Sequence, residues 1–141
     1  MSTKQIKSFK NNYYFLSNFF PCFVEFEGLT YPSAECAYQA AKTLDPNIRA
    51  YFTIMDTSME ARRWGNNIQL RPDWNQCRYD IMDTILHTKF SLPYLKMMLL
   101  STGDSYLEEG NGHNDTYWGT VKGKGQNNLG KLLMNIREEL R

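Results

Sequence analysis

The sequence predicts a mainly α-helical domain of the α+β type, with one small β-hairpin and a few short strands. Two long segments, 73–90 and 128–139, carry apolar residues at the spacing of amphipathic helices. Three shorter segments begin with residues that commonly cap helices. Only residues 23–31 alternate as a hairpin does, so helices should dominate. The 141 residues are expected to form a single compact domain over 1–141, with residues 1–10 as a candidate flexible segment.

The first thirty residues are predicted to contain extended structure. Residues 9–20 are rich in Tyr, Phe and Asn, and we expect a short strand or extended segment there that ends at 16–19. Residues 23–31 predict a small hairpin with Gly28 in the turn, because short hairpin turns favour glycine.

Three helix starts follow, each marked by a capping residue. Ser33 is predicted to cap a helix that extends to about residue 44, with Glu35 in its first turn. Asp45 precedes a proline and should cap a second, short helix. Thr57 begins a capping-box pattern for a third helix, which Gly65 is expected to end.

The second half of the chain contains the clearest helical patterns. The helix predicted at 73–90 has an apolar stripe made of Trp74, Cys77, Ile81, Ile85 and Leu86. A further helix is expected at 93–100 and a short strand at 105–109. The helix predicted at 128–139 buries a stripe made of Leu129, Leu132, Leu133, Ile136 and Leu140.

Composition and charge exclude several classes of protein. The net charge of +1 gives no strong field for gathering nucleic acid non-specifically. The three cysteines form no CxxC pair and no disulfide framework, which is typical of a reducing cytoplasm. No stretch is apolar and long enough for a membrane span, and the polar N-terminus predicts no signal peptide. We therefore expect a cytoplasmic location.

The glycine-rich run 121–130 leads directly into the last predicted helix. Glycines before a helix let backbone N–H groups approach a ligand, and the helix dipole favours negative charge. Lys122 and Lys124 add positive charge, so one interpretation is a phosphate or pyrophosphate cradle. The run matches neither a Walker A loop nor a dinucleotide-binding motif, and a flexible surface loop is the alternative.

The stretch 114–119 places a carboxylate beside two aromatic side chains. A base could stack on Tyr117 or Trp118, while Asp115 could hydrogen-bond a ribose or act at the reacting centre. The alternative is an Asx-turn with a tryptophan in the core.

Glu35 also has two interpretations. A carboxylate in the first turn of a helix commonly just complements the dipole. As a catalytic group it would need a partly buried site. The neighbouring Cys36 is interpreted as a small buried apolar residue. Because the chain has only two histidines and scattered cysteines, no metal site is predicted.

Taken in order, several blocks of the sequence resemble the NADAR (YbiA-like) family over nearly the whole chain. The blocks are Leu16-Ser17-Asn18-Phe19, Tyr31-Pro32-Ser33-Ala34-Glu35, Tyr38-Gln39-Ala40-Ala41-Lys42, Lys89-Phe90, Asn114-Asp115-Thr116-Tyr117-Trp118-Gly119, Gly123 to Gly130, and Leu132 to Arg137. Each block alone is weak, but the ordered set is specific. The family's usual Ser-Glu-His reads Ala34-Glu35-Cys36 here.

The resemblance implies a mostly helical fold and an N-glycosidase that needs no cofactor and no metal. Substrates known for the family include ribosylated pyrimidine intermediates of riboflavin synthesis, and ADP-ribose linked to guanine in nucleotides or nucleic acid. The implied active-site set is Glu35, Asp115 and Trp118. The implied pocket lining is Asn18, Phe19, Gln39, Lys42, Tyr117 and Asn128.

Cleavage of a ribosyl C1–N bond develops positive charge on the sugar, which a carboxylate stabilises. We expect Glu35 to be this carboxylate and to meet Asp115 and Trp118 across one ribose-sized cleft. Lys122, Lys124 and Asn128 would hold phosphate. The alternatives are a non-catalytic module that binds ADP-ribose or a modified nucleotide, and a structural or partner-binding helical domain.

Overall fold

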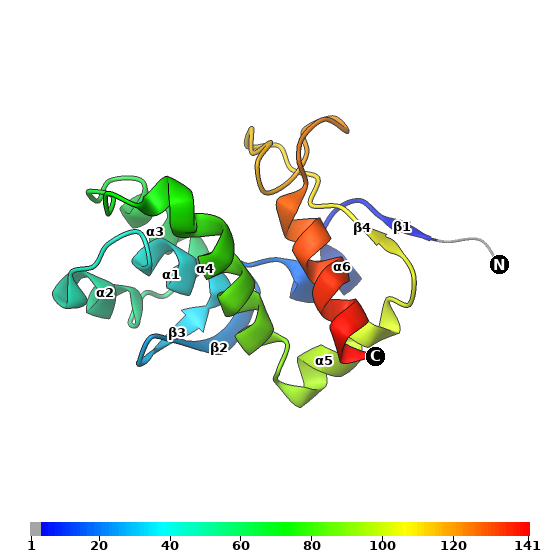
Figure 1. The fold of residues 1–141 in the computed structure, drawn as a ribbon, viewed down its shortest axis with the longest axis horizontal. Helices are drawn as coiled ribbons and strands as arrows, with labels where there is room; N and C mark the ends of the chain where they lie inside the picture. The colour runs from blue at the N-terminus through cyan, green and yellow to red at the C-terminus, as the bar shows by residue number, and fades with distance from the viewer. Residues whose placement is uncertain (1–3) are drawn as a thin grey trace. The chain divides into compact units, whose positions relative to one another are not determined.

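The computed structural model describes residues 4–141 and has the predicted mainly helical fold with small two-stranded sheets (Figure 1). The elements, in chain order, are β1 (Gln5–Ile6), the 3-10 helix η1 (Asn11–Leu16), β2 (Pro21–Phe26), β3 (Leu29–Ser33), α1 (Ala34–Ala40), α2 (Pro46–Phe52), α3 (Ser58–Gly65), α4 (Trp74–Lys89), α5 (Pro93–Ser101), β4 (Tyr106–Leu107) and α6 (Asn128–Leu140).

The contacts divide the chain into two units, each with its own set of elements. One is the continuous segment Asn18–Ser91, called here the central unit. The other combines residues 4–17 with Leu92–Arg141 and is called the terminal unit. The candidate flexible segment 1–10 lies partly outside the described residues, which begin at Lys4. Within the described part, Gln5 and Ile6 form β1.

The hairpin of the central unit is the one predicted at 23–31. Strands β2 and β3 pair antiparallel with Val24 opposite Tyr31, and the side chains of β2 alternate between exposed and buried. The buried side packs against α1 and α4. Glu27 and Gly28 both have positive φ in the turn, 47° and 89°, as the tightest hairpin turns require.

The three predicted caps of the central unit are confirmed. Ser33 Oγ accepts a hydrogen bond from the amide of Cys36 at the start of α1. Asp45 Oδ1 and Thr57 Oγ1 accept corresponding bonds at the starts of α2 and α3. The capping-box partner departs from the expected pattern, because Glu60 accepts from the amide of Asp56, one residue before the cap. Helix α1 ends at Ala40, four residues before the predicted limit.

Two sequence predictions are wrong in detail. Residues 9–20 were expected to be extended, but they contain η1, which buries the adjacent side chains of Phe15 and Leu16. A strand could not turn two adjacent side chains to one side, whereas a 3-10 turn can. In α4 the buried face contains Met82 and Lys89 rather than Cys77 and Ile81, which are half-buried.

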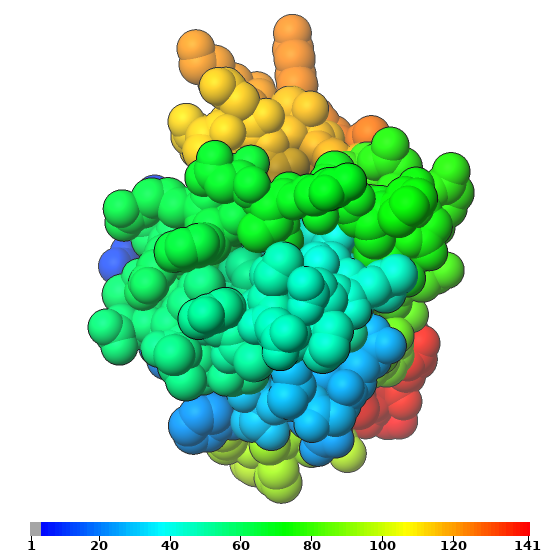
Figure 2. Space-filling model, turned by 90° about the vertical axis from the view of Figure 1, so that its left-hand side faces the viewer, coloured from blue at the N-terminus to red at the C-terminus, as the bar shows by residue number. Residues whose placement is uncertain are grey.

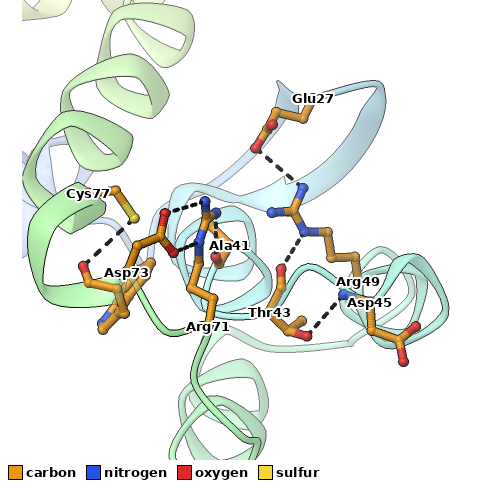
Figure 3. Close-up of polar contacts among 9 residues, drawn as sticks. Glu27, Ala41, Thr43, Asp45, Arg49, Arg71, Asp73 and Cys77 are labelled. Carbon is orange, nitrogen blue, oxygen red and sulfur yellow. Dashed lines mark hydrogen bonds and ion pairs between the residues drawn. The ribbon is translucent and has the colours of Figure 1, made fainter.

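Two arginines tie the irregular segments of the central unit together (Figure 3). Arg49 donates from Nε to the carbonyl of Thr43 at 2.8 Å and from Nη1 to Glu27 at 3.3 Å. Arg71 forms a bidentate pair with Asp73, with N···O distances of 2.7 and 3.1 Å.

A cavity of about 310 Å³ lies beside Thr43 and Arg71, and none of the predicted site residues lines it. Figure 2 shows the face on which α2 and α3 lie at the surface.

The terminal unit is held together by parallel pairing of β1 with β4, which places Gln5 opposite Tyr106. Helix α6 packs against β4 and α5. It buries Leu129, Leu132, Leu133 and Ile136 as predicted, while Leu140 is half-buried. Arg137 is also buried, and its Nη1 donates to Thr102 Oγ1 and the carbonyl of Ser105, each at 2.9 Å. Within residues 4–141, no helix has the length and apolar character needed to cross a bilayer.

Candidate functional site

Glu35 occupies the first turn of α1, where the Ser33 cap and the end of β3 fix the direction of the helix. The residue is only 6% exposed, which is unusual for a carboxylate without a structural or chemical role. Its amide donates to the carbonyl of Asn18 at 2.9 Å. Glu35 is therefore held in a buried environment at both its backbone and its side chain.

Gln39 lies one turn after Glu35 on the same helix and contacts it directly. Its Nε2 donates to Glu35 Oε2 at 2.6 Å, and both residues are buried. A charge-assisted bond of this length fixes the orientation of the carboxylate.

Two cations lie near the same carboxylate. Arg62 of α3 places Nε 3.9 Å from Glu35 Oε2, and its guanidinium stacks 4.4 Å from the ring centre of Phe19. Burial lowers the pKa of Lys42; Glu35 opposes this shift and Arg62 adds to it. Phe19, Glu35, Gln39, Lys42 and Arg62 are called here the Glu35 cluster. Only Arg62 was missed from the sequence.

Asn18 has a buried polar atom that lacks a partner. Its Nδ2 contacts the sulfur of Met82 at 3.4 Å, and its Oδ1 is buried and accepts no hydrogen bond from any residue between 4 and 141. A buried acceptor left unsatisfied costs about 1–3 kcal/mol. Because the carbonyl of Asn18 accepts a hydrogen bond from the amide of Glu35, this side-chain oxygen belongs to a residue tied directly to Glu35. It is suited to accept a hydrogen bond from a ligand.

Cys36 fits the interpretation as a small buried residue. It is almost fully buried, and burial raises the pKa of its thiol, with the Ser33 hydroxyl opposing the shift. The thiol is therefore protonated near neutral pH and is a poor nucleophile.

Asp115 lies in a loop of the terminal unit and organises the two aromatic residues that follow it. Its Oδ1 accepts from the amides of Tyr117 at 3.1 Å and Trp118 at 2.8 Å, so the Asx-turn considered from the sequence is present. Trp118 is 9% exposed, and its ring packs edge-to-face on the ring of Tyr117, with the two ring centres 4.8 Å apart. No residue in the range 4–141 donates a hydrogen bond to Asp115 Oδ2. One oxygen thus builds the turn and the second can contact a ligand.

Asn111 holds this loop together, a role that sequence reasoning missed. Its Oδ1 accepts from the amides of His113 and Asp115, and its Nδ2 donates to the carbonyls of Asp115 and Thr120. Gly119 lies close to Asn111, since a Cβ added at Gly119 would lie 2.8 Å from Asn111 Nδ2 and would also overlap Glu109. The only sequence signal for this hub is its position in a glycine-rich loop.

The predicted phosphate cradle has a different construction from the one expected. The first two amides of α6, at Asn128 and Leu129, already donate to the carbonyls of Tyr117 and Trp118. Lys122 has φ of 53° in a tight turn bridged by Val121 and Lys124. Contacts to an anion would therefore come from the exposed side chains of Lys122 and Lys124 and from Asn128, and not from the amides of Asn128 and Leu129.

A cavity of about 530 Å³ lies beside Lys122 within the terminal unit. Its other lining residues include Lys7, Tyr106, Glu108 and Thr120. The hydroxyl of Thr120 donates to Glu108 at 2.6 Å, so that carboxylate is already hydrogen-bonded.

The predicted site residues thus fall into two groups, one in each unit. The Glu35 cluster and Asn18 belong to the central unit. Asp115, Tyr117, Trp118, Lys122, Lys124 and Asn128 belong to the terminal unit. The cleft predicted between Glu35 and the Asp115 loop stays a prediction.

Comparison with known proteins identifies the family to which the chain belongs. A family model described as "NADAR domain" matches residues 5–141. The chain belongs to the NADAR family. The resemblance inferred from the ordered blocks is confirmed.

Individual NADAR relatives agree with this assignment. N-glycosidase YbiA of Shigella sonnei is 36% identical over 137 residues, which cover 94% of this chain and 85% of that protein. The solution structure of Escherichia coli YbiA matches with a TM-score of 0.84 at 34% identity, over 99% of this chain and 87% of that one. These relatives make the chain a hydrolase of the glycosidase class.

A longer relative has a different name. A riboflavin biosynthesis protein of Vibrio vulnificus is 38% identical over 134 residues. These residues cover 92% of this chain but only 36% of the Vibrio protein, so this chain spans about a third of that relative's length.

Proposed function

We propose that this NADAR chain hydrolyses a ribosyl C1–N bond. The substrate is an ADP-ribosylated guanine base or nucleotide, or a ribosylated pyrimidine intermediate of riboflavin synthesis. The observation that carries the proposal is the buried carboxylate of Glu35, fixed by Gln39 at 2.6 Å with Arg62 3.9 Å away. The name of the N-glycosidase relatives supports cleavage of an N-glycosidic bond, and the name of the riboflavin relative supports the pyrimidine substrates. The ADP-ribosylated guanine substrates rest on the family resemblance.

In the proposed reaction, Glu35 stabilises the oxocarbenium-like sugar and takes a proton from the attacking water. The water oxygen adds to C1 as the C1–N bond breaks, and the proton that Glu35 took from the water passes to the nitrogen of the leaving base, which restores the carboxylate. Gln39 keeps the carboxylate in place during this step. Asp115 holds the ribose through Oδ2 or shares the proton transfer, and Tyr117 and Trp118 stack on the base or shield it from water.

The phosphate groups of the substrate would be bound by the exposed cationic side chains of Lys122 and Lys124, with Asn128 as a hydrogen-bond donor. The substrate would be either a small nucleotide-type molecule or an ADP-ribosylated nucleic acid. We place this reaction in the cytoplasm, since Cys22, Cys36 and Cys77 are all free thiols.

One chromatographic assay tests the function. Purified protein is incubated with ADP-ribosylated guanosine, ADP-ribosylated DNA and the ribosylated riboflavin precursors in separate reactions. Release of free base from one of them, and its loss in Glu35→Gln, is the expected result. Absence of free base from all three would overturn the proposal.

Calorimetry on the same ligands distinguishes the alternative of a non-catalytic binding module. A protein that binds ADP-ribose tightly, yet releases no base, would be a reader of the modification and not a hydrolase. The Asp115 turn and its aromatic pair would serve such a reader equally well.

A further inference from the structure

Gly65, the last residue of α3, lies against the side chain of Gln39. A Cβ added at Gly65 would overlap Gln39 Oε1 and would lie 2.6 Å from Cδ and 3.0 Å from Cβ of Gln39. The backbone of Gly65 does not require glycine, because its φ is not positive. Alanine would favour the helix by about 0.5–1 kcal/mol over glycine, so the glycine must serve some other need.

The two ends of the Gln39 side-chain amide have different neighbours. On one side Nε2 donates to Glu35 Oε2 at 2.6 Å. On the other side Oε1 is buried, faces Gly65 and has no hydrogen-bond partner among the residues that the structure describes. Packing against Gly65 is therefore what keeps the carbonyl end of the amide in place, and with it the orientation of the N–H group that reaches Glu35.

The same glycine also contacts a second member of the Glu35 cluster. The carbonyl of Gly65 accepts a long hydrogen bond, 3.5 Å, from Nζ of Lys42. Gln39 and Lys42 are three residues apart and share one side of the α1 end. The last residue of α3 thus contacts the side chains of both Gln39 and Lys42.

We propose that Gly65 is a positioning residue for the Glu35 carboxylate and acts through Gln39. This inference rests on the proposed function of Glu35. The end of a glutamine side chain moves easily, so an added methyl group displaces the amide of Gln39 without unfolding α3. Glu35 then loses the donor that fixes Oε2 and keeps its charge stabilised.

Kinetics of Gly65→Ala test the proposal on whichever substrate the wild type cleaves. We expect kcat to fall about tenfold or more, with KM changed by less than about threefold. The acidic limb of the pH–rate profile should move to higher pH, because the carboxylate has lost a hydrogen-bond donor. An unchanged kcat and an unchanged profile would overturn the proposal.

Two comparisons separate positioning from general destabilisation. Gly28→Ala introduces strain in the hairpin turn, where an added Cβ meets no atom within 4 Å, and it should lower stability but not kcat. In a Gln39→Ala background, Gly65→Ala should change kcat by less than about twofold, because the residue through which it acts is gone. Equal losses from Gly65→Ala in both backgrounds would show a purely structural role.

A readout without activity keeps this test independent of the proposed function. In ¹⁵N-labelled protein, the side-chain amide signals of Gln39 should shift strongly in Gly65→Ala and stay unchanged in Gly28→Ala. If the wild type cleaves no substrate, the proposed function fails while the NMR result still decides whether Gly65 positions Gln39. Unshifted Gln39 signals in Gly65→Ala would reject the inference.

Discussion

The side-chain amide of Gln39 donates a 2.6 Å hydrogen bond to Oε2 of Glu35, one turn earlier on α1. The contact joins residues four apart in the chain, so the helix itself sets their distance. Arg62 approaches the same oxygen from α3. The carboxylate is therefore oriented by its own helix and approached by a charge from another, an arrangement that allows each contribution to be tested separately.

Glu35→Gln removes the negative charge while keeping nearly the same shape. We expect kcat to fall about 10²- to 10⁴-fold, the range typical of general acid–base groups, with ligand affinity within a few-fold of wild type. Free base release measures the first quantity and calorimetry the second. Near-normal turnover in this variant would remove Glu35 from the mechanism.

Arg62→Gln removes the cation near Glu35 and its stacking on Phe19. Because both partners belong to the Glu35 cluster, we expect kcat/KM to fall about tenfold. Arg63→Gln is the matched control, since Arg63 is the next residue of α3 and its side chain is exposed. Similar losses in the two variants would show that the overall charge of α3 matters, and not the contact with Glu35.

Asn111→Ala deletes the hydrogen bonds that hold the Asp115 loop. We expect a loss of about 1–3 kcal/mol in the free energy of unfolding, and faster hydrogen exchange at the amides of Tyr117 and Trp118. Asn67→Ala is a suitable comparison, because Asn67 is exposed and its side chain makes a single bond to the carbonyl of Arg63. Unchanged exchange at both amides would contradict the assigned role of Asn111.

Lys89→Met tests the fully buried lysine of α4. Burial lowers the pKa of Lys89 to about 8, and Cys22 opposes the shift. Below pH 8 the lysine is charged in folded and unfolded chains alike, and the full cost of burying the charge is present. Between pH 8 and the ordinary value of 10.5, the unfolded chain binds more protons, so raising the pH stabilises the wild type.

Denaturant unfolding at several pH values checks this prediction. The wild type should gain up to about 3 kcal/mol relative to Lys89→Met across that window. The exposed Lys131, changed to Met, should show a constant difference from wild type over the same range. A constant difference for Lys89→Met as well would mean that the charge is not buried in the folded protein.

Local features of the fold could be predicted because their causes are local. The caps at Ser33, Asp45 and Thr57 depend on a side chain two or three residues from the amide it accepts. The stripe of α6 repeats often enough to reveal its period. Glu35 could be placed in the first turn of α1 for the same reason, because the Ser33 cap fixes where that helix begins.

Features that depend on distant residues left no such trace. Strand β1 is two residues long, too short for any alternation, whereas the equally short β4 lies within the strand expected at 105–109. Arg62 was overlooked because only the packing of α3 against α1 brings it to Glu35. Lys89 was not expected inside because charged side chains are rarely buried, and the aromatic rings of Phe20 and Phe90 that face it come from separate parts of the chain.

The pairing of Gln5 with Tyr106 has a consequence for biosynthesis. During synthesis, β1 is made before β4, and on the order of a hundred further residues must be added before its partner strand exists. The segment Asn18–Ser91 is complete before that strand is made and can begin to fold while β1 is still unpaired. A strand that is made before all the other described elements is therefore among the last of them to pair.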